Sequence, residues 1–182
     1  VPDIRIEQSY VALVSDRAFD RSLSEIDRLL PVFANAGIAT RYFCMPIDWY
    51  LAPHGWRERN RLYVEHAVDL LESAALRCLE QAGLGIEDID GIVTVSTTGI
   101  ATPSLDALLM ERLRAPRAMR RLPLFGLGCA GGVIGLSRAV EMAAARPGAR
   151  VLVLVVELCS LTFRFGDNSN SNIIAAALFG DG

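Results

Sequence analysis

The chain has 182 residues, of which 52% are hydrophobic and 21% are charged, and these proportions exclude an intrinsically disordered protein. The formal net charge of −3 gives no basic patch for nucleic-acid binding. No apolar run reaches the roughly 20 residues of a membrane span, and the first residues, VPDIRIEQ, lack the pattern of a signal peptide. We therefore expect a cytoplasmic protein with neither a nucleic-acid nor a membrane partner.

The cysteines and histidines give no metal-binding pattern. The four cysteines form no C-x-x-C pair, and the two histidines add no spacing typical of a zinc site. We therefore expect no bound metal, and reduced thiols as in most intracellular proteins. These residues are Cys44, Cys78, Cys129 and Cys159, with His54 and His66.

The first half of the chain predicts one long helix and several shorter elements. Residues 4–7 alternate weakly and predict a short strand, and apolar residues at helical spacing predict a helix between Ser22 and Gly37. Residues 40–56 are rich in aromatic residues and proline, which indicates an extended or irregular segment. A long amphipathic helix is then expected over 57–82, ended by a glycine.

The second half alternates strand and helix patterns. We expect a buried strand within 149–158, because its consecutive Val and Leu residues are typical of a strand covered on both faces. The alternation predicts the α/β class, with helices covering a central sheet. The other elements expected here are a strand at 91–97, a helix at 104–113 capped by Ser104, a strand and turn at 121–128, and a helix at 130–145.

The last residues, 172–182, read NIIAAALFGDG and form a strand-like apolar run with no evident partner. Natural domains seldom finish on an unpaired run of this kind. We therefore expect the chain to be a fragment of a longer polypeptide.

The stretch GLGCAGGVIG, residues 126–135, has three possible interpretations. Gly126, Gly128 and Gly131 fit the G-x-G-x-x-G loop of dinucleotide-binding proteins, with Glu157 as a somewhat late ribose-binding acid. The glycines could instead serve only a tight turn and close packing, with Cys129 as a small buried residue. In the third interpretation Cys129 is a nucleophile.

The nucleophile interpretation has a physical basis. A cysteine at a helix N-terminus faces unpaired N–H groups and the positive end of the helix dipole, which favours the thiolate. The same N–H groups can receive the oxyanion formed when a thioester is attacked. A base is missing, since neither His54 nor His66 lies in a motif resembling a catalytic histidine.

Four motifs decide between these interpretations: STTGIATPSLD, RLPLFGLGCAGGVIGL, PGARVLVLVVELCSLTFR and ALFGDG. In this order and spacing they resemble the bacterial type III polyketide synthases of the chalcone and stilbene synthase family, from about residue 35 to the last residue. The resemblance implies the N-terminal half of a two-part thiolase-like fold, with α-β-α layers and a mixed sheet covered by helices. Residues 1–182 would form this one domain, with the C-terminal half absent.

The resemblance implies a mechanism in which Cys129 accepts an acyl group from a starter acyl-CoA as a thioester. Decarboxylation of malonyl-CoA then supplies the carbanion for a Claisen condensation, and the product cyclises to a phenol or pyrone. The family needs no cofactor beyond its CoA substrates and forms homodimers. Its catalytic histidine and asparagine lie in the C-terminal half, so we expect residues 1–182 alone to be inactive.

The resemblance also implies roles for further residues. Phe179 matches a phenylalanine that guides decarboxylation, although an aromatic residue at the end of an apolar strand is usually part of a core. Thr102 would reach into the partner's cavity across a dimer interface, or simply form a turn. The other residues implied to contact substrate are Thr97 beside the nucleophile, Glu157 as a buried hydrogen-bonded acid, Cys159, Ser160 and Thr162 at a strand end shaping the elongation pocket, and Arg41 against the CoA phosphates.

Three alternatives remain at this point. A different condensing enzyme of the thiolase fold, such as a β-ketoacyl-ACP synthase III, would share the nucleophile. An NAD(P)-dependent oxidoreductase would use the glycine spacing instead. A non-catalytic domain that dimerises would use neither.

Overall fold

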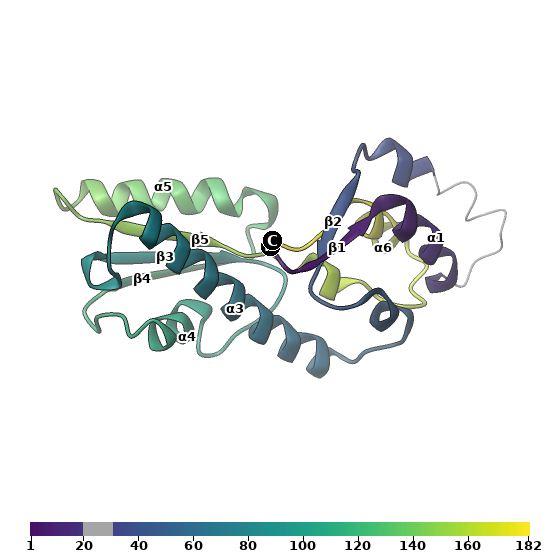
Figure 1. The fold of residues 1–182 in the computed structure, drawn as a ribbon, viewed down its shortest axis with the longest axis horizontal. Helices are drawn as coiled ribbons and strands as arrows, with labels where there is room; N and C mark the ends of the chain where they lie inside the picture. Colours follow the sequence, from purple (N-terminus) through teal and green to yellow (C-terminus); the bar gives the residue numbers. More distant parts are fainter. Residues whose placement is uncertain (20–30) are drawn as a thin grey trace. The chain divides into compact units, whose positions relative to one another are not determined.

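The computed structural model describes residues 1–19 and 31–182, and these form two compact units (Figure 1). One unit combines Val1–Leu62 with Leu158–Gly182, and we call it the terminal unit. The other is Tyr63–Glu157, which we call the central unit.

The terminal unit is built on a two-stranded antiparallel sheet of β1 (Ile4–Glu7) and β2 (Thr40–Phe43), in which Ile4 pairs with Phe43 and Glu7 with Thr40. Its helices are α1 (Gln8–Ala18) and α6 (Asn170–Leu178), with short 3-10 turns η1 (Ile47–Leu51) and η4 (Cys159–Thr162). The side chains that form its apolar core are Ile6, Val11, Phe33, Phe43, Tyr50 and Ala177.

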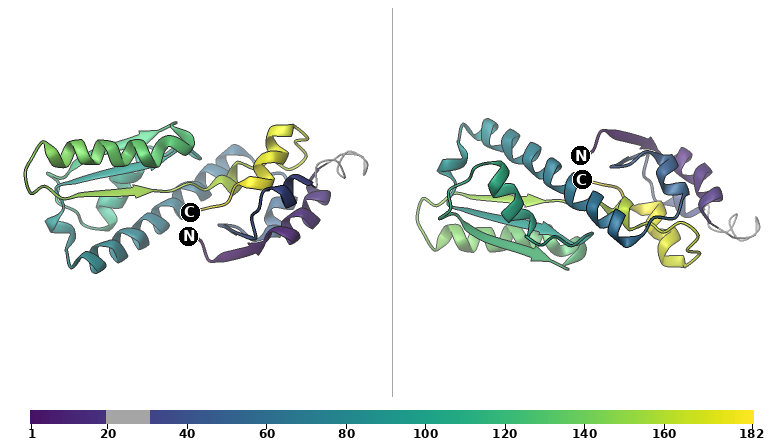
Figure 2. Two further views of the ribbon diagram at one scale, coloured as in Figure 1. Left: turned by 90° about the horizontal axis from the view of Figure 1, so that it is seen from above. Right: turned by 90° about the horizontal axis from the view of Figure 1, so that it is seen from below.

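The central unit contains a parallel sheet in the order β4-β3-β5, formed by β3 (Gly91–Ser96), β4 (Arg120–Phe125) and β5 (Val151–Val155). Parallel neighbours need crossover connections, which α4 (Leu105–Arg112) and α5 (Gly131–Ala144) provide. In Figures 1 and 2, α5 lies over one face of the sheet, while α4 and the long helix α3 (Trp56–Ala82) lie over the other. A 3-10 turn, η2 (Ile86–Asp88), leads from α3 into β3.

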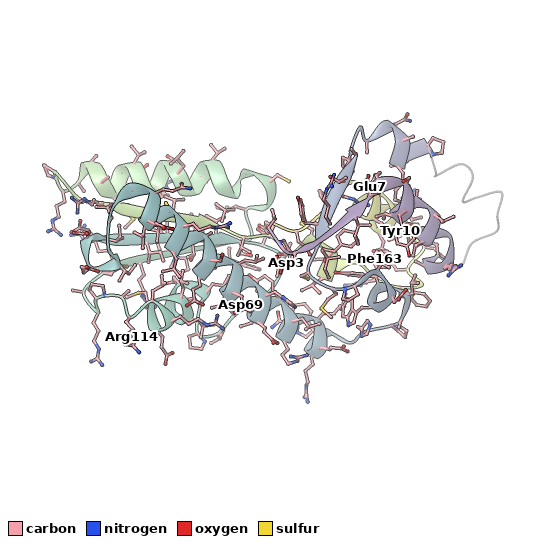
Figure 3. The ribbon with its side chains drawn as sticks, viewed as in Figure 1. Asp3, Glu7, Tyr10, Asp69, Arg114 and Phe163 are labelled. Atoms are coloured by element: carbon pink, nitrogen blue, oxygen red, sulfur yellow. The ribbon has the colours of Figure 1, made fainter. Side chains whose placement is uncertain are left out.

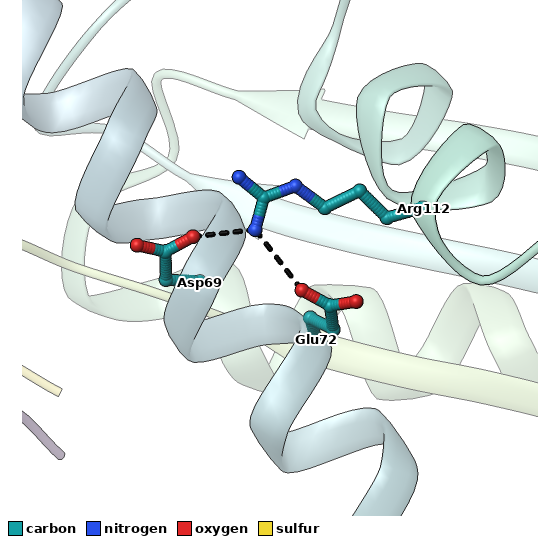
Figure 4. Close-up of polar contacts among 3 residues, drawn as sticks. All are labelled: Asp69, Glu72 and Arg112. Atoms are coloured by element: carbon teal, nitrogen blue, oxygen red, sulfur yellow. Dashed lines mark hydrogen bonds and ion pairs between the residues drawn. The ribbon is translucent and has the colours of Figure 1, made fainter.

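Polar contacts join α3 to its neighbours in the central unit. The Arg112 guanidinium, at the end of α4, donates to Asp69 and, at 3.0 Å, to Glu72 on α3 (Figure 4). These two carboxylates raise the pKa of Arg112. The buried hydroxyl of Tyr63 donates to Ser96 Oγ at 2.7 Å, which fixes α3 to the end of β3.

The structure confirms several predicted elements. The long helix predicted at 57–82 is α3, and Gly83 ends it in the left-handed conformation with φ +64°. The strands predicted at 4–7 and 91–97, the strand and turn at 121–128, and the helix at 130–145 are also present within a residue or two. The α/β class is therefore confirmed, with the parallel and antiparallel pairings in separate sheets.

Some predictions lie partly outside the described residues or were incomplete. Of the helix expected between Ser22 and Gly37, residues 31–35 are helical and Gly37 has φ +66°, but 20–30 are not described. The segment 40–56, expected to be extended or irregular, contains β2 and η1. Ser104 occupies the N-cap position of α4, yet its hydroxyl makes no capping hydrogen bond there.

Two predictions about apolar segments were wrong. The strand buried on both faces is β3, whose six residues are all buried, because it lies in the middle of the sheet. On β5 the buried residues alternate with half-buried ones, and Val155 is 46% exposed. The final apolar run is the helix α6 rather than a strand, since Ser169 caps its N-terminus by accepting from Asn172 N, and its alanines favour a helix.

Helix α5 presents an apolar stripe to solvent within the described structure. Val133, Leu136 and Val140 are 77%, 57% and 61% exposed, and their spacing places them on one side of the helix. The opposite side carries the buried residues Gly131, Gly135 and Ala139. The helix is therefore apolar on both sides, which is typical of a helix covered by protein on both sides.

Candidate active site

Cys129 lies on a sharp turn between the central unit's strand β4 and helix α5. Residues Gly128–Ala130 form the 3-10 turn η3, which leads directly into the first residue of α5. The turn begins at Gly126 and Gly128, whose φ angles of +80° and +54° favour glycine. Cys129 is exposed and its thiol is free. The predicted position of this cysteine at a strand-to-helix turn is therefore confirmed.

Two glycines of α5 bring this helix close to the sheet. A Cβ atom added to Gly131 would lie 2.6 Å from Val95 Cγ1, and one added to Gly135 would lie 2.6 Å from Val95 Cγ2. Real Cβ atoms do not approach a neighbour so closely, so larger residues at these positions would push the helix off β3. The glycine spacing therefore serves the turn and the packing of α5.

Thr97 connects the cysteine turn to the end of β3. Its hydroxyl oxygen accepts a hydrogen bond from Gly128 N, the residue before the cysteine, at 3.1 Å. Glu157, just beyond β5, was expected to be buried and is half-buried, and its carboxylate accepts from both Thr97 N and Thr98 N at 3.0 Å. One oxygen of Glu157 thus fixes the segment of Thr97 and Thr98, and the Thr97 hydroxyl fixes the turn that carries Cys129.

These contacts unite the ends of all three parallel strands. Thr97 follows β3, Gly128 follows β4 and Glu157 follows β5, so the groups converge at the carboxyl edge of the sheet, where α/β folds commonly place their sites. The structure therefore brings together Thr97, Cys129 and Glu157 as predicted neighbours. The Glu157 carboxylate oxygen that the dinucleotide interpretation would offer to ribose already accepts two backbone N–H groups.

The remaining predicted residue of the central unit, Thr102, lies on the exposed loop between β3 and α4. The peptide bond between Thr102 and Pro103 is cis. Its side chain is open to solvent, and its assignment to a dimer interface stays a prediction.

The other predicted residues line one cavity in the terminal unit, with a volume of about 50 Å³. Its wall is largely apolar and comes from α1, β2, η1, η4 and α6. An aromatic residue at the end of an apolar strand is usually buried in a core. Phe179 is instead 43% exposed. The predicted residues on this wall are Arg41, Cys159, Ser160, Thr162 and Phe179.

Two expectations for this cavity need correction. Cys159, Ser160 and Thr162 form the 3-10 turn η4 and not a strand end, because β5 already ends at Val155. The Arg41 side chain was expected against CoA phosphates, yet it is buried and donates to the carbonyl oxygen of Phe179 at 2.7 Å. Burial lowers the pKa of Arg41 to about 10, with Asp181 opposing the shift. The structure supports a structural contact for Arg41 and gives no support to a phosphate contact.

A buried polar cluster surrounds Asp181, and it was not evident from the sequence. The Asp181 carboxylate accepts from Cys44 N at 2.8 Å, from Ser160 N at 2.8 Å and from Ser160 Oγ at 2.6 Å. The Tyr50 hydroxyl lies 2.6 Å from Ser160 Oγ. The cluster holds the segment after α6, which carries Phe179, against η4. The only sign of this cluster in the sequence is the polar ending Gly-Asp-Gly after an apolar run.

Burial sets the ionisation of this cluster. It raises the pKa of the Cys44 thiol to about 12, and the neighbouring Asp181 adds to the shift. Burial also raises the pKa of Asp181 and of the Tyr50 hydroxyl above their ordinary values. Cys44 is therefore a poor nucleophile, because thiol reactivity requires the thiolate.

Neither histidine lies on the turn that carries Cys129. His54 contacts Trp49 O at 2.8 Å and Glu58 at 3.0 Å, and His66 lies half-buried on α3. Among residues 1–19 and 31–182 no helix is long and apolar enough to cross a membrane. Within the same residues no group of His, Cys, Asp and Glu side chains is arranged to hold a metal ion.

Comparison with known proteins identifies the family of this chain. Residues 51–182 match the family profile of the chalcone and stilbene synthases, N-terminal domain. The chain belongs to this family. A putative chalcone synthase of Bacillus subtilis is 41% identical over 187 residues, covering all of this chain and 51% of that protein.

Other relatives agree with this assignment. A 1,3,6,8-tetrahydroxynaphthalene synthase of Streptomyces peucetius is 41% identical over 148 residues, covering 81% of this chain and 39% of that protein. The crystal structure of the Streptomyces coelicolor 1,3,6,8-tetrahydroxynaphthalene synthase, a bacterial type III polyketide synthase, superposes with a TM-score of 0.93 at 31% identity. That superposition covers all of this chain and 52% of the other. The chain thus spans about half the length of the family members it matches, and it shares their thiolase-like fold.

Proposed function

We propose that the chain is the N-terminal half of a type III polyketide synthase, with residues 1–182 as one domain of the two-part fold. The observation that carries the proposal is the exposed Cys129 on a turn that Thr97 and Glu157 hold at the sheet edge. Membership of the chalcone and stilbene synthase family supports it independently.

In the proposed loading step, the Cys129 thiolate attacks the thioester carbonyl of a starter acyl-CoA. The carbonyl electrons move to oxygen, and in this proposal the unpaired N–H groups of the first turn of α5 stabilise that oxyanion. Collapse of the intermediate expels the CoA thiolate and leaves the acyl group on Cys129. Sulfur suits this role because it both attacks and leaves easily.

In the extension step, malonyl-CoA loses CO₂ and its carbanion attacks the acyl carbonyl on Cys129. A carbon–carbon bond forms, the bond to sulfur breaks and the Cys129 thiolate is regenerated. The extended chain, now a thioester of CoA, is transferred back to Cys129 with release of CoA before each further round, and the finished chain cyclises to a phenol or pyrone. CoA thioesters are thus the substrates, and the chemistry requires no additional cofactor.

The proposed roles of the other residues follow their positions. Glu157 and Thr97 hold the cysteine turn. By resemblance to the family, Cys159, Ser160, Thr162 and Phe179 are assigned to the pocket for the growing chain. Thr102 is assigned to the interface of a homodimer. The four free cysteines fit a reducing compartment such as the cytoplasm.

We also propose that residues 1–182 do not complete a condensation by themselves. The histidine and asparagine expected by resemblance to promote decarboxylation are not represented by His54 or His66, whose environments are described above. The missing groups would come from a C-terminal half, and the exposed apolar stripe of α5 fits burial against such a half.

The test uses the complete polypeptide encoded by the reading frame that contains this chain. It is incubated with malonyl-CoA, alone and with a panel of acyl-CoA starters, and products are analysed by liquid chromatography and mass spectrometry. We expect polyketide products, their loss in Cys129→Ala, and unchanged activity in Cys78→Ala, which removes another exposed thiol. Products that survive Cys129→Ala would refute the proposal, and a lack of products with every starter would favour a non-catalytic domain.

A further inference from the structure

A second cavity in the terminal unit has a different character from the apolar one. Its volume is about 420 Å³, within the range of small-molecule sites. Its wall comes from η1 and the loop that follows, from the first turn of α3, and from the segment after η4. The lining includes two arginines, Arg59 and Arg164, and the rings of Trp49, His54, Phe163 and Phe165.

The two arginines share this cavity as like charges. Burial lowers the pKa of Arg59, and the positive charge of Arg164 lowers it further. Arg59 Nη1 makes one long hydrogen bond, to Phe163 O at 3.4 Å, and its Nε is buried without a partner among the described residues. Arg59 is half-buried and its guanidinium carries five N–H donors, so beyond the long bond to Phe163 O it retains donor capacity for a ligand.

Two acids close in sequence to these arginines, Glu58 and Asp167, have hydrogen-bond partners of their own. The Glu58 carboxylate binds His54 Nδ1 at 3.0 Å and accepts from Trp49 Nε1 at 3.4 Å, and the bond from His54 lowers the pKa of Glu58. Asp167 accepts from Ser169 N at 2.9 Å, and that bond is the main reason why its pKa is lowered. Arg164 contributes a smaller attraction to Asp167.

Both walls of the cavity are fixed before any ligand arrives. The Trp49 and His54 rings stack with centroids 3.9 Å apart and planes 7° from parallel. On the other side, Asn172 accepts from Arg164 N at 3.1 Å and donates to Arg164 O at 2.8 Å. Phe163, labelled in Figure 3, packs edge-on against Phe19 of the same unit. Such preorganisation lowers the entropic cost of binding.

We propose that this cavity binds a phosphate group, held between the guanidinium groups of Arg59 and Arg164. A phosphate offers several acceptor oxygens to two forked donors, and its negative charge relieves the repulsion between the arginines. The aromatic wall further favours a phosphate monoester that carries a planar ring, which can stack there. This inference concerns the terminal unit alone and does not depend on the proposed synthase activity.

The test titrates the 182-residue chain with inorganic phosphate and with adenosine monophosphate, by isothermal calorimetry and NMR at fixed ionic strength. We expect saturable binding, with shifts confined to the lining residues. Arg164→Gln should weaken it at least about tenfold, since a hydrogen bond to a charged group contributes about 1.5–3 kcal/mol. Arg164 is exposed, so this variant should fold, and Arg59→Gln provides a second variant.

The matched control is Arg57→Gln, which removes the same charge from the first turn of α3 but does not line the cavity. We expect it to change the affinity by less than about twofold. Tighter binding of the monophosphate than of inorganic phosphate would show that the rings take part, and equal binding would limit the site to the phosphate. The proposal would be overturned if Arg57→Gln and Arg164→Gln weakened phosphate binding equally. It would also be overturned if phosphate binding did not saturate below about 10 mM, which would indicate an adventitious ion only.

Discussion

The contact between α5 and β3 gives the sharpest prediction about stability. At Gly135 a methyl group would lie 2.6 Å from Val95 Cγ2 and 3.7 Å from Val93 Cγ1. Val95 is 1% exposed on the central strand, and as a β-branched residue it has little freedom to move aside. We therefore expect Gly135→Ala to destabilise the chain although alanine is the better helix former.

The magnitude follows from two opposing effects. Overpacking a core costs about 1–3 kcal/mol, and alanine in place of glycine inside a helix contributes about 1 kcal/mol in return. The net loss in unfolding free energy should therefore be about 0–2 kcal/mol. Gly132→Ala is the matched control, because its methyl would lie 4.0 Å from Val155 Cγ2. This control should raise the unfolding free energy by about 0.5–1 kcal/mol.

Urea denaturation followed by circular dichroism measures both changes. The double variant Val95→Ala with Gly135→Ala should recover stability relative to the sum of the single changes, because the shortened side chain makes room for the methyl. If Gly135→Ala is as stable as Gly132→Ala, or if the two sites show no coupling, the close packing of α5 on β3 is refuted.

Three further predictions concern the site and the surface. In the complete polypeptide, Glu157→Ala should slow acylation at least about tenfold, because it leaves Thr97 N unpaired. Glu157→Gln keeps an acceptor oxygen and should retain more activity. Equal acylation rates in the two variants would contradict the role of Glu157 as the acceptor that holds the Thr97 segment. In the folded chain at pH 8, iodoacetamide should alkylate the exposed Cys78 far faster than Cys44, because Cys44 is buried and its raised pKa keeps the thiol protonated. Mass spectrometry of digested protein measures both sites, and comparable rates would contradict the buried cluster. Arg112→Ala should lower the unfolding free energy by less than about 1 kcal/mol, because its ion pairs are exposed, and a larger loss by urea denaturation would show that the contact in Figure 4 fixes α4 to α3.

The parts of the fold that sequence predicts well are those with a strong local signal. Helix α3 shows helical periodicity over its whole length and ends at a glycine with positive φ. The turn at Cys129 was predictable because Gly126 and Gly128 mark a conformation that other residues avoid. Thr97 and Glu157 were found through resemblance, and the hydrogen bonds between their segments came only from the structure.

The errors arose where tertiary position decides the outcome. A run of Val and Leu shows that β5 is a strand, but the position of a strand in the sheet order determines how many faces are buried. The apolar run at 172–178 suits a helix or a strand equally, and the N-cap at Ser169 is what favours the helix. Arg41 resembled a surface cation, yet its guanidinium is buried by contacts from residues more than a hundred positions away.

The most direct test of the account is the mass of the acyl-enzyme formed by the complete polypeptide. After incubation with a starter acyl-CoA and a rapid acid quench, intact mass and peptide mapping locate the adduct. The account predicts one acyl group, placed on Cys129 and absent from Cys129→Ala. An adduct on Cys78 or Cys159 instead, or one that persists in Cys129→Ala, would contradict the assignment of Cys129 as the nucleophile.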